Sequence, residues 1–308
     1  MRPAWPLLAA AATGVQVGAA IVATRFVIGE TTPAALALLR YAIGVLILLP
    51  AVLLAPRTPI ARRDLVPIAL LGIGQFGILI ALLNFGLQTV PAARAALVFS
   101  TFPLLTLVLA ALLGHERLTM RKTIGVLLTI AGVGIALGER FVAAAALPVG
   151  LGDAAVLASA LTGAACSVLY RPYLRRYPAL PVSALAMLAS VAFLALFATA
   201  EGFFAQPIRF THGGWLAIVF IGVSSGVGYF LWLYALRHAA ATRVTVFLAL
   251  SPVTAAALGA LLLAETITPG LAAGVLCVAA GLWLATRGPS SDGVDAGRQP
   301  DERAARNR

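Results

Sequence analysis

The sequence predicts an all-α integral membrane protein with ten transmembrane helices in two inverted five-helix repeats. Three observations predict this fold class: the composition, the series of apolar runs and an internal repeat. Of the 308 residues, 61% are hydrophobic and 11% are charged, and the mean hydropathy is +0.99. A soluble domain has about 45–50% apolar and about 25% charged residues. This composition could not cover the surface of a soluble protein, whereas a lipid bilayer favours it.

The formal net charge of +11 does not indicate a nucleic-acid partner. The basic residues stand mostly in short segments between apolar runs, which is the distribution of loops in membrane proteins. Cys166 and Cys277 lie inside apolar runs, so we expect no disulfide framework. None of the three histidines has a second ligand at metal spacing, and we expect neither a metal nor a cofactor.

Each predicted helix follows from an apolar run bounded by charges or turn residues. Crossing the hydrocarbon core takes about 20 such residues. The first run carries no charge from Pro3 to Thr24 and has no clear cleavage site before a polar segment, so it predicts a membrane helix rather than a secretory signal. The ten predicted helices lie at about 5–27, 34–55, 65–87, 92–113, 120–138, 150–170, 181–200, 213–236, 242–263 and 268–286. The polar tail at 288–308 is predicted to be disordered.

The basic residues also predict the orientation. If the N-terminus lies in the cytoplasm, most Lys and Arg residues fall on the inner side, while the outer side receives Arg25, Arg40, Arg94, Arg140 and Arg209. The positive-inside rule then places both termini, and the tail, in the cytoplasm. The single lysine among many arginines and alanines is typical of a GC-rich bacterial genome, so we expect a multi-pass protein of the bacterial cytoplasmic membrane.

The internal repeat appears when the second half is shifted by 149 residues. Polar residues, prolines and glycines then coincide, which chance rarely produces: Arg94 with Arg243, Pro103 with Pro252, Glu116 with Glu265, Thr119 with Thr268, and Gly77, Gly125 and Gly132 with Gly226, Gly274 and Gly281. Each half has five predicted helices, an odd number, so the halves must enter the membrane in opposite senses. Inverted repeats are typical of secondary transporters, which bind their solute near the midplane between the halves.

At these residues the chain resembles the EamA domains of the drug/metabolite transporter superfamily, over 6–137 and 151–286. The matching segments are L-L-R-Y-A-I-G at 38–44, the run from Pro103 that ends in G-H-E-R-L-T at Thr119, and A-E-T-I-T at 264–268. The last segment departs from the usual pattern, with Ala264 in place of Gly and Ile267 in place of Leu. The resemblance implies ten helices, a central cavity, and outward transport of amino acids or other small organic solutes.

The repeated polar residues are first interpreted as structural. Glu116 and Glu265 each stand at a helix end, where a carboxylate can contact a neighbouring helix start or a basic loop. Thr119 and Thr268 follow them and fit the N-cap positions of the next helices. A direct role of the two glutamates in transport is the alternative.

Prolines and glycines shape the predicted helices. Pro103 and Pro252 remove a helix hydrogen bond, and either a hinge or a packing bend would explain them. Four G-x-x-x-G pairs permit close helix approach, which leaves packing within the monomer and a homodimer both open. These pairs are Gly14/Gly18, Gly134/Gly138, Gly222/Gly226 and Gly270/Gly274.

Polar residues inside apolar helices are the candidates for the solute pathway. Gln75 and Asn84 are nine residues apart and point to opposite faces of one helix, so only one of them can line a cavity. We favour Asn84, because its face also carries Gly77. Gln16 is a third amide, which could equally join helices.

Aromatic and charged residues add further candidates. Tyr170, Tyr229 and Trp232 offer aromatic surface with hydrogen-bonding groups, with interfacial anchoring as the alternative. Arg40 could snorkel to the interface or attract an anionic group; the resemblance includes an Arg at this position and favours a shared structural role.

Three further interpretations concern mechanism. Asp153, or one of the repeated residues Glu116 and Glu265, is a candidate for proton coupling; an uncoupled uniporter or an exchanger is the alternative. A channel-like facilitator would need rings of charge or a carbonyl filter, which are not visible. The Gly222–Gly226 segment fits G-x-S-x-G, but an intramembrane enzyme would need a strand-to-helix turn and acid and histidine partners there, so we expect no enzyme.

Overall fold

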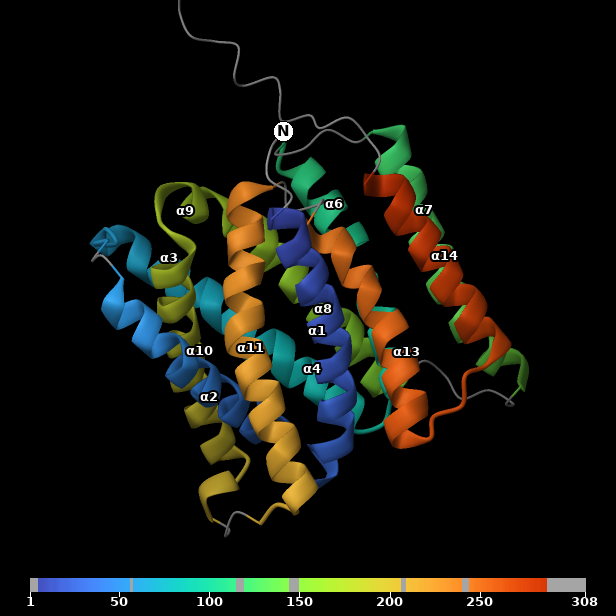
Figure 1. Ribbon diagram of the computed structural model, residues 1–308, viewed down its shortest axis with the longest axis horizontal. Helices are drawn as coiled ribbons and strands as arrows, with labels where there is room; N and C mark the ends of the chain where they lie inside the picture. The colour runs from blue at the N-terminus through green and yellow to red at the C-terminus, as the bar shows by residue number, and fades with distance from the viewer. Residues whose placement is uncertain are drawn as a thin grey trace, which may run out of the picture.

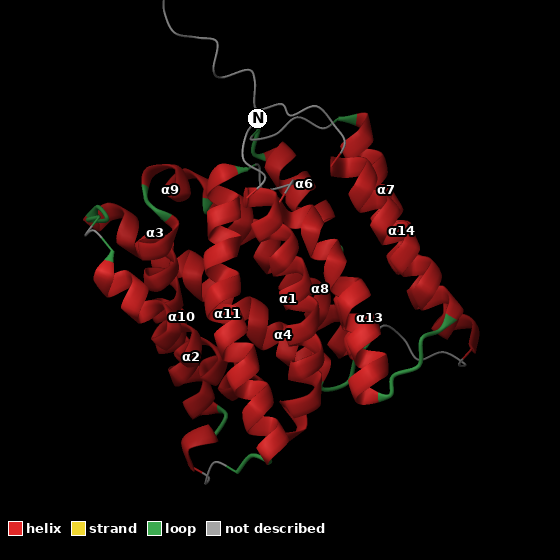
Figure 2. Cartoon of the chain, viewed as in Figure 1, coloured by secondary structure: helices red, strands yellow, loops and turns green. Residues whose placement is uncertain are grey.

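The protein is a helical bundle in the computed structural model, which describes residues 5–55, 58–114, 119–143, 150–205, 209–239 and 244–286. Within these ranges helices and loops account for the whole chain, without a strand (Figure 2). The elements before residue 144 are α1 (Trp5–Val27), η1 (Ile28–Glu30), α2 (Pro33–Leu54), α3 (Arg62–Gly72), the π-helical η2 (Ile73–Ile78), α4 (Leu79–Leu87), α5 (Ala92–Phe99), α6 (Phe102–Leu112) and α7 (Met120–Ala143). The later elements are α8 (Leu151–Leu169), α9 (Arg171–Arg176), α10 (Ala179–Ala200), η3 (Phe203–Ala205), α11 (His212–His238), η4 (Val246–Ala249), α13 (Leu250–Leu263) and α14 (Pro269–Thr286).

Several of these helices have the length and composition of membrane spans. Seven described spans are long and apolar enough to cross a bilayer, and two shorter apolar helices follow at Leu250–Leu263 and Pro269–Gly281. The chain is therefore a multi-pass membrane protein. The tail predicted at 288–308 lies outside the described residues.

The helices run between two ends of the bundle (Figure 1). The chain enters α1 at the end marked N, at the top of the figure, and leaves it at the opposite end. We call this opposite end the distal end; α1, α4, α10 and α13 end there, and α2, α5, α8 and α11 begin there. Helices α7 and α14 lie side by side at one edge of the bundle (Figure 1).

The sequence explains several helix boundaries. Pro33 stands in the first turn of α2, where its missing N–H is no loss. Gly114 and Gly202 follow α6 and α10 at positive φ values of 68° and 78°, a conformation that a residue without a Cβ adopts readily.

Two predicted helices are interrupted. The span predicted at 92–113 breaks at Ser100 and Thr101, whose hydroxyls donate to the carbonyls of Leu97 and Val98, and Pro103 lies in the first turn after the break. In the second half the 3₁₀ helix η4 precedes α13, which carries Pro252 in its first turn. Both prolines thus start a helix after an interruption rather than bending a continuous one.

Glycine contacts recur at the offset of the sequence repeat. A Cβ on Gly226 would lie 2.9 Å from the Gly44 carbonyl oxygen, so α11 and α2 approach through their backbones. A Cβ on Gly77 would lie 3.0 Å from the Phe193 ring, between η2 and α10. Since Gly77 and Gly226 are 149 residues apart, and residues 44 and 193 likewise, the second contact is a copy of the first.

The α7–α14 pair shows the same reciprocity. A Cβ on Gly132 would lie 2.6 Å from the Gly274 carbonyl oxygen, and a Cβ on Gly281 would lie 2.4 Å from the Gly125 carbonyl oxygen. Exchanging each residue with its repeat equivalent converts one contact into the other. Any side chain larger than hydrogen at these positions would push the two helices apart.

Candidate functional site

A small cavity lies near the middle of the bundle, among α1, α2, η2, α4, α5, α6, α11 and η4. Its volume of about 40 Å³ has room for about three water molecules and is well below the roughly 300–1,000 Å³ of typical ligand pockets. Both halves of the sequence contribute to its walls. Its polar lining consists of Thr13, Gln16, Arg40, Gln75, Tyr229 and Trp232.

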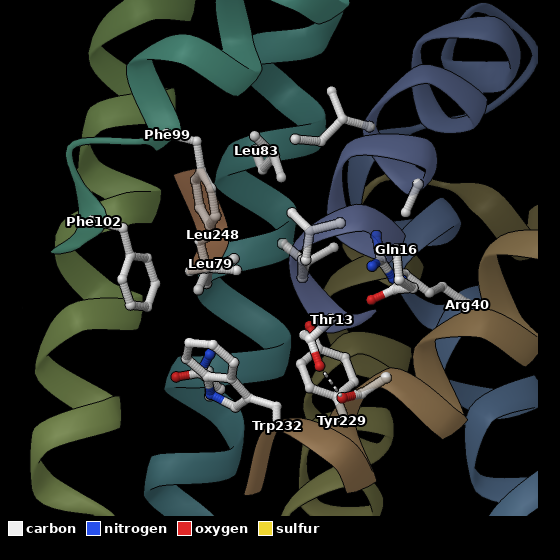
Figure 3. A pocket seen from close by; sticks show the side chains of 16 residues that line it. Thr13, Gln16, Arg40, Leu79, Leu83, Phe99, Phe102, Tyr229, Trp232 and Leu248 are labelled. Atoms are coloured by element: carbon white, nitrogen blue, oxygen red, sulfur yellow. Dashed lines mark hydrogen bonds between the residues drawn. The ribbon is translucent and has the colours of Figure 1, made fainter. Parts of the chain in front are cut away.

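The cavity has a polar side and an apolar side (Figure 3). Thr13, Gln16, Arg40 and Tyr229 lie together on the side formed by α1, α2 and α11. The opposite side, formed mainly by α4, α5, α6 and η4, carries Leu79, Leu83, Phe99, Phe102 and Leu248. Trp232 of α11 lies on this side too, in contact with Phe102. An amphipathic molecule would match this division, with its polar group against the first side and its apolar body against the second.

Arg40 is a buried cation on the polar side, with 5% of its surface exposed. Its Nε donates to Ser225 Oγ at 2.6 Å, and its guanidinium carbon lies 5.6 Å from the centre of the Tyr41 ring. Its two terminal nitrogens make no hydrogen bond or ion pair with any residue that the structure describes. Burial of a charge without an opposite charge is costly.

Gln16 contacts α11 in a space that Gly228 leaves open. Its Nε2 donates to Ser224 Oγ at 3.3 Å, and Thr13 Oγ1, one turn earlier in α1, lies 3.4 Å from the Gly228 carbonyl oxygen. A Cβ at Gly228 would come within 2.5 Å of Gln16 Oε1. Gly228 therefore leaves the space in which this amide lies.

Gln75 and Trp232 carry buried polar atoms without partners. Gln75 Oε1 and Trp232 Nε1 accept or donate no hydrogen bond within the described residues, although both side chains are at least 96% buried. The Trp232 ring contacts Phe102 edge-on, with 6.0 Å between ring centres. Buried polar groups usually have partners, so these two are open to a ligand or to water.

The two cavity amides stand at exchanged positions of the repeat. Gln16 faces Ser224, and the repeat equivalents of these residues are Ala165 and Gln75. In the contact between α1 and α11 the amide is on α1, the first helix of its half. In the equivalent contact between α8 and η2 the amide is on η2, so it comes from the other member of the contact. The amides do not coincide in the sequence alignment of the halves, and only the packing reveals this relation.

Tyr229 is positioned by other aromatic rings. Its hydroxyl shares a hydrogen bond of 2.5 Å with the Tyr41 hydroxyl. Its ring contacts Phe76 edge-on at 4.2 Å between centres and Tyr41 at 5.4 Å. These contacts join α2, η2 and α11 directly behind the polar side of the cavity.

Asn84 and Tyr170 do not line this cavity. Asn84 Nδ2 donates to the Pro33 carbonyl at 2.9 Å and so contacts the start of α2, while Gln75 takes the cavity position that we had expected for Asn84. The helix face that carries Asn84 and Gly77 packs against a neighbouring helix, since Gly77 lies against Phe193 of α10. Tyr170 is fully buried in the main core.

The repeated glutamate of the second half connects two helices. Glu265 accepts hydrogen bonds from the backbone N–H groups of Ala92 at 3.0 Å and Ala93 at 3.3 Å, at the start of α5. A carboxylate there satisfies free N–H groups and favours the positive end of the helix dipole. Its equivalent, Glu116, lies outside the described residues.

The two repeated threonines lie at helix starts. Thr119 Oγ1 accepts from the N–H of Lys122 at 3.4 Å, before the first turn of α7. Thr268 Oγ1 accepts from the N–H of Leu271 at 3.2 Å, before α14. Both hydroxyls thus have the geometry of an N-cap.

Asp153 lies at the distal end in an ion pair. Its carboxylate accepts two hydrogen bonds from the Arg94 guanidinium, at 2.7 and 2.9 Å, in a bidentate arrangement. The side chains of Arg94 and Asp153 are 24% and 12% exposed. Asp153 is not among the residues that line the cavity.

Two further carboxylates at the distal end were not found from the sequence. Glu30 accepts from both the backbone N–H and the hydroxyl of Thr211, at the start of α11. Glu201 accepts from the N–H of Ala34 at the start of α2. Each is a single acidic residue in the connection between two long helices, Glu30 at the end of η1 and Glu201 in the turn after α10. Its partner lies more than 160 positions away in the sequence, so no local pattern identifies it.

The G-x-S-x-G segment lies inside α11 rather than at a strand-to-helix turn. Ser224 contacts Gln16, and Ser225 donates to the Ile221 carbonyl while it accepts from Arg40. Within the described part of the chain, no group of three or more His, Cys, Asp or Glu residues could hold a metal ion.

Known proteins resemble this chain in sequence and in structure. An uncharacterized transporter of Archaeoglobus fulgidus is 30% identical over 88% of this chain and 94% of its own length. A "Probable terminal-alkyne amino-acid exporter" of Streptantibioticus cattleyicolor is 32% identical over 76% of this chain and 77% of its own. A crystal structure of a protein 24% identical in sequence has the same fold, with a TM-score of 0.71 over 90% of this chain and 95% of that one.

The family model gives the broadest match. The model of the EamA-like transporter family matches residues 4–138 and again residues 150–287. The two matches together include nearly every helix of the bundle and all the residues around the central cavity. The chain belongs to the EamA-like transporter family.

Proposed function

We propose that this protein is a secondary transporter that exports a small organic, amino-acid-like solute across the bacterial cytoplasmic membrane by alternating access. The observation that carries the proposal is the central cavity. Within its described lining, Arg40 is a buried cation without an opposite charge, and Gln75 and Trp232 have polar atoms without partners. A transported solute would supply those partners. The cavity is too small for such a solute, so binding requires the surrounding helices to move apart.

Ten membrane helices in two inverted repeats provide that movement. The reciprocal contacts Gly44–Gly226 and Gly77–Phe193, together with those of α7 and α14, support a pseudo-two-fold relation between 6–137 and 151–286. Two similar halves give two similar conformations, each open to one side of the membrane. The broken helices before Pro103 and Pro252 lie where the halves meet at the cavity and are the proposed hinges.

The orientation follows the positive-inside rule, with both termini in the cytoplasm and the distal end outside. The carboxylate contacts of Glu30, Glu201, Glu265 and Asp153 then close the outer end of the bundle. Outward transport is supported by the related protein that is named an amino-acid exporter.

Transport by the purified full chain in proteoliposomes tests the proposal. We would screen labelled amino acids and other amphipathic metabolites, with and without a pH gradient. Tyr229→Ala and Gln75→Leu should each reduce the flux about tenfold or more, because both side chains line the cavity. Leu54→Ala, on the exposed outer surface of α2, is the matched control and should transport normally.

Each outcome bears on a different part of the proposal. Saturable, solute-selective flux that the two cavity variants weaken would support a carrier with this site. Selective flux that both variants leave unchanged would place the solute elsewhere. Fast flux that does not saturate would indicate a channel, and coupling at Asp153 would require proton-dependent flux to be lost in Asp153→Asn.

A further inference from the structure

We infer that Arg40 binds the anionic head of the solute, and that the cavity selects amphipathic carboxylates: small molecules with one carboxylate and an apolar or aromatic body. This inference rests on the proposed transport function and names the class of solute. Among the described residues around the cavity, Arg40 is the only charged side chain. The cavity therefore attracts anions and repels cations.

The hydrogen bonds of Arg40 hold the guanidinium by one edge. Nε donates to Ser225 Oγ, and that hydroxyl in turn donates to the Ile221 carbonyl, so the orientation of the pair is fixed by the backbone of α11. The terminal nitrogens remain without partners within the described residues. A carboxylate is the ligand that the planar guanidinium binds best, through two parallel hydrogen bonds.

Burial strengthens the preference of Arg40 for a carboxylate. Arg40 is 5% exposed, and an ion pair there is little screened by water or salt. The ring of Tyr41 on α2 provides some compensation for the charge, but a cation–π contact is much weaker than an ion pair with a carboxylate. A bound anion would neutralise this buried charge.

The rest of the cavity fits an apolar body. Figure 3 shows Phe99 and Phe102 on the side of the cavity opposite Arg40 and Gln16. Trp232 adds an aromatic face with a free N–H, and Gln75 adds a free oxygen. The described lining residues include no carboxylate, so an ammonium group finds only neutral acceptors such as Gln75 Oε1 there and is tolerated but not required.

A series of phenyl compounds separates the contributions of head and body. The full-length protein in detergent would be titrated with 3-phenylpropionate, phenylalanine, phenethylamine and acetate, and binding followed by thermal stabilisation and by tryptophan fluorescence, to which Trp232 contributes. The inference predicts binding of the first two compounds. Phenethylamine, which lacks the carboxylate, and acetate, which lacks the body, should each bind about tenfold more weakly or less. Binding of phenylalanine alone would show that the ammonium is required and would overturn the assigned class.

Substitutions then assign the carboxylate to Arg40. Arg40→Gln should weaken 3-phenylpropionate binding about 10- to 100-fold, the effect of losing one hydrogen-bonded charge. Arg40→Lys should restore part of it, since the charge remains and the bidentate geometry does not. Arg63→Gln, which removes an exposed arginine outside the cavity, should bind as the parent does.

The results distinguish this inference from the proposed function. If Arg40→Gln folds, as judged by its melting temperature, and binds carboxylates normally, the inference is wrong while the transporter proposal stands. Equal binding of phenethylamine and 3-phenylpropionate would likewise overturn it. Only the absence of saturable flux for every solute screened would count against the proposed function itself.

Discussion

The distal end and the central cavity use the same kinds of polar residue in opposite ways. At the distal end, the carboxylates of Glu30, Glu265 and Asp153 all have hydrogen-bond partners on other helices. In the cavity, Gln75 and Trp232 are more deeply buried and yet each keeps a polar atom without a partner among the described residues. The three carboxylates have partners within the protein, whereas the two cavity residues each have a polar atom without one.

The lack of a partner indicates a ligand site only for an atom that also lines the cavity. Seven of the nine buried polar atoms without a partner among the described residues lie outside the cavity lining, including the Thr31 and Thr32 hydroxyls at the distal end. A satisfied group stabilises the conformation in which it is satisfied and must lose its partners when the helices separate. An unsatisfied buried group lowers stability and offers its binding energy to a ligand. Substitutions to apolar residues should therefore change stability in opposite directions at the distal carboxylates and at Gln75.

The largest effect is expected at the Arg94–Asp153 ion pair. Arg94→Ala should lower the free energy of unfolding by about 2 kcal/mol, between the 0–1 kcal/mol of a surface pair and the 3–5 kcal/mol of a fully buried one. The reason is that Asp153, 12% exposed, would keep its charge without a partner. Unfolding in mixed micelles would measure the change.

A double-mutant cycle isolates the interaction. Adding Asp153→Ala to Arg94→Ala should recover part of the loss, because no unpaired charge remains. Independent, additive losses would mean that the contact does not contribute to stability, and the comparison between the two regions would fail at its strongest point.

A smaller loss is expected where Glu265 caps α5. Glu265→Ala should cost about 1–2 kcal/mol of unfolding free energy, since the N–H groups of Ala92 and Ala93 would lose their acceptor. Glu265→Gln should cost less, as one oxygen remains. The melting temperature of each variant would be compared with that of Thr266→Ala, an exposed neighbour that should melt as the parent does.

Much of the fold could be predicted from the sequence because lipid imposes a simple rule. A chain in hydrocarbon must satisfy its backbone groups internally, so each long apolar run becomes a helix. The start of α1 at Trp5 and the end of α4 at Leu87 coincide with the predicted 5–27 and 65–87. The break at Ser100 and the π-helical η2 were not predicted, since hydropathy does not distinguish helix types.

The site was harder to predict because the direction in which a helix side chain points depends on how the helices pack together. Gln16, Arg40, Tyr229 and Trp232 were candidates and lie around the cavity. The choice of Asn84 over Gln75 rested on a glycine, but a glycine marks a close helix contact at least as often as a cavity. No sequence pattern shows which of two opposite helix faces meets a neighbouring helix.

Gln75→Leu should change stability in the opposite direction to the distal variants. Removing a buried oxygen that has no partner, and replacing it with an apolar side chain of similar size, should raise the unfolding free energy by up to about 1 kcal/mol. The same variant should transport poorly. Gln88→Leu, an exposed amide farther along the chain, is the control for the added apolar surface. A clear loss of stability in Gln75→Leu would show that Gln75 is a structural residue after all.

The smallest effect concerns the backbone that carries Glu265 to α5. Ala264 has a φ of 51°, a left-handed conformation that costs a residue with a Cβ about 1–2 kcal/mol and costs glycine little. Glycine also has more conformational entropy in the unfolded chain, which offsets part of the gain. Ala264→Gly should therefore raise the unfolding free energy by about 0.5 kcal/mol. Combining it with Glu265→Ala in one protein tests whether the strained backbone at Ala264 positions the Glu265 carboxylate at the distal end. If the strain serves to position the carboxylate, Ala264→Gly should weaken the effect of Glu265→Ala by loosening the cap; if the gain is purely local, the two changes should add.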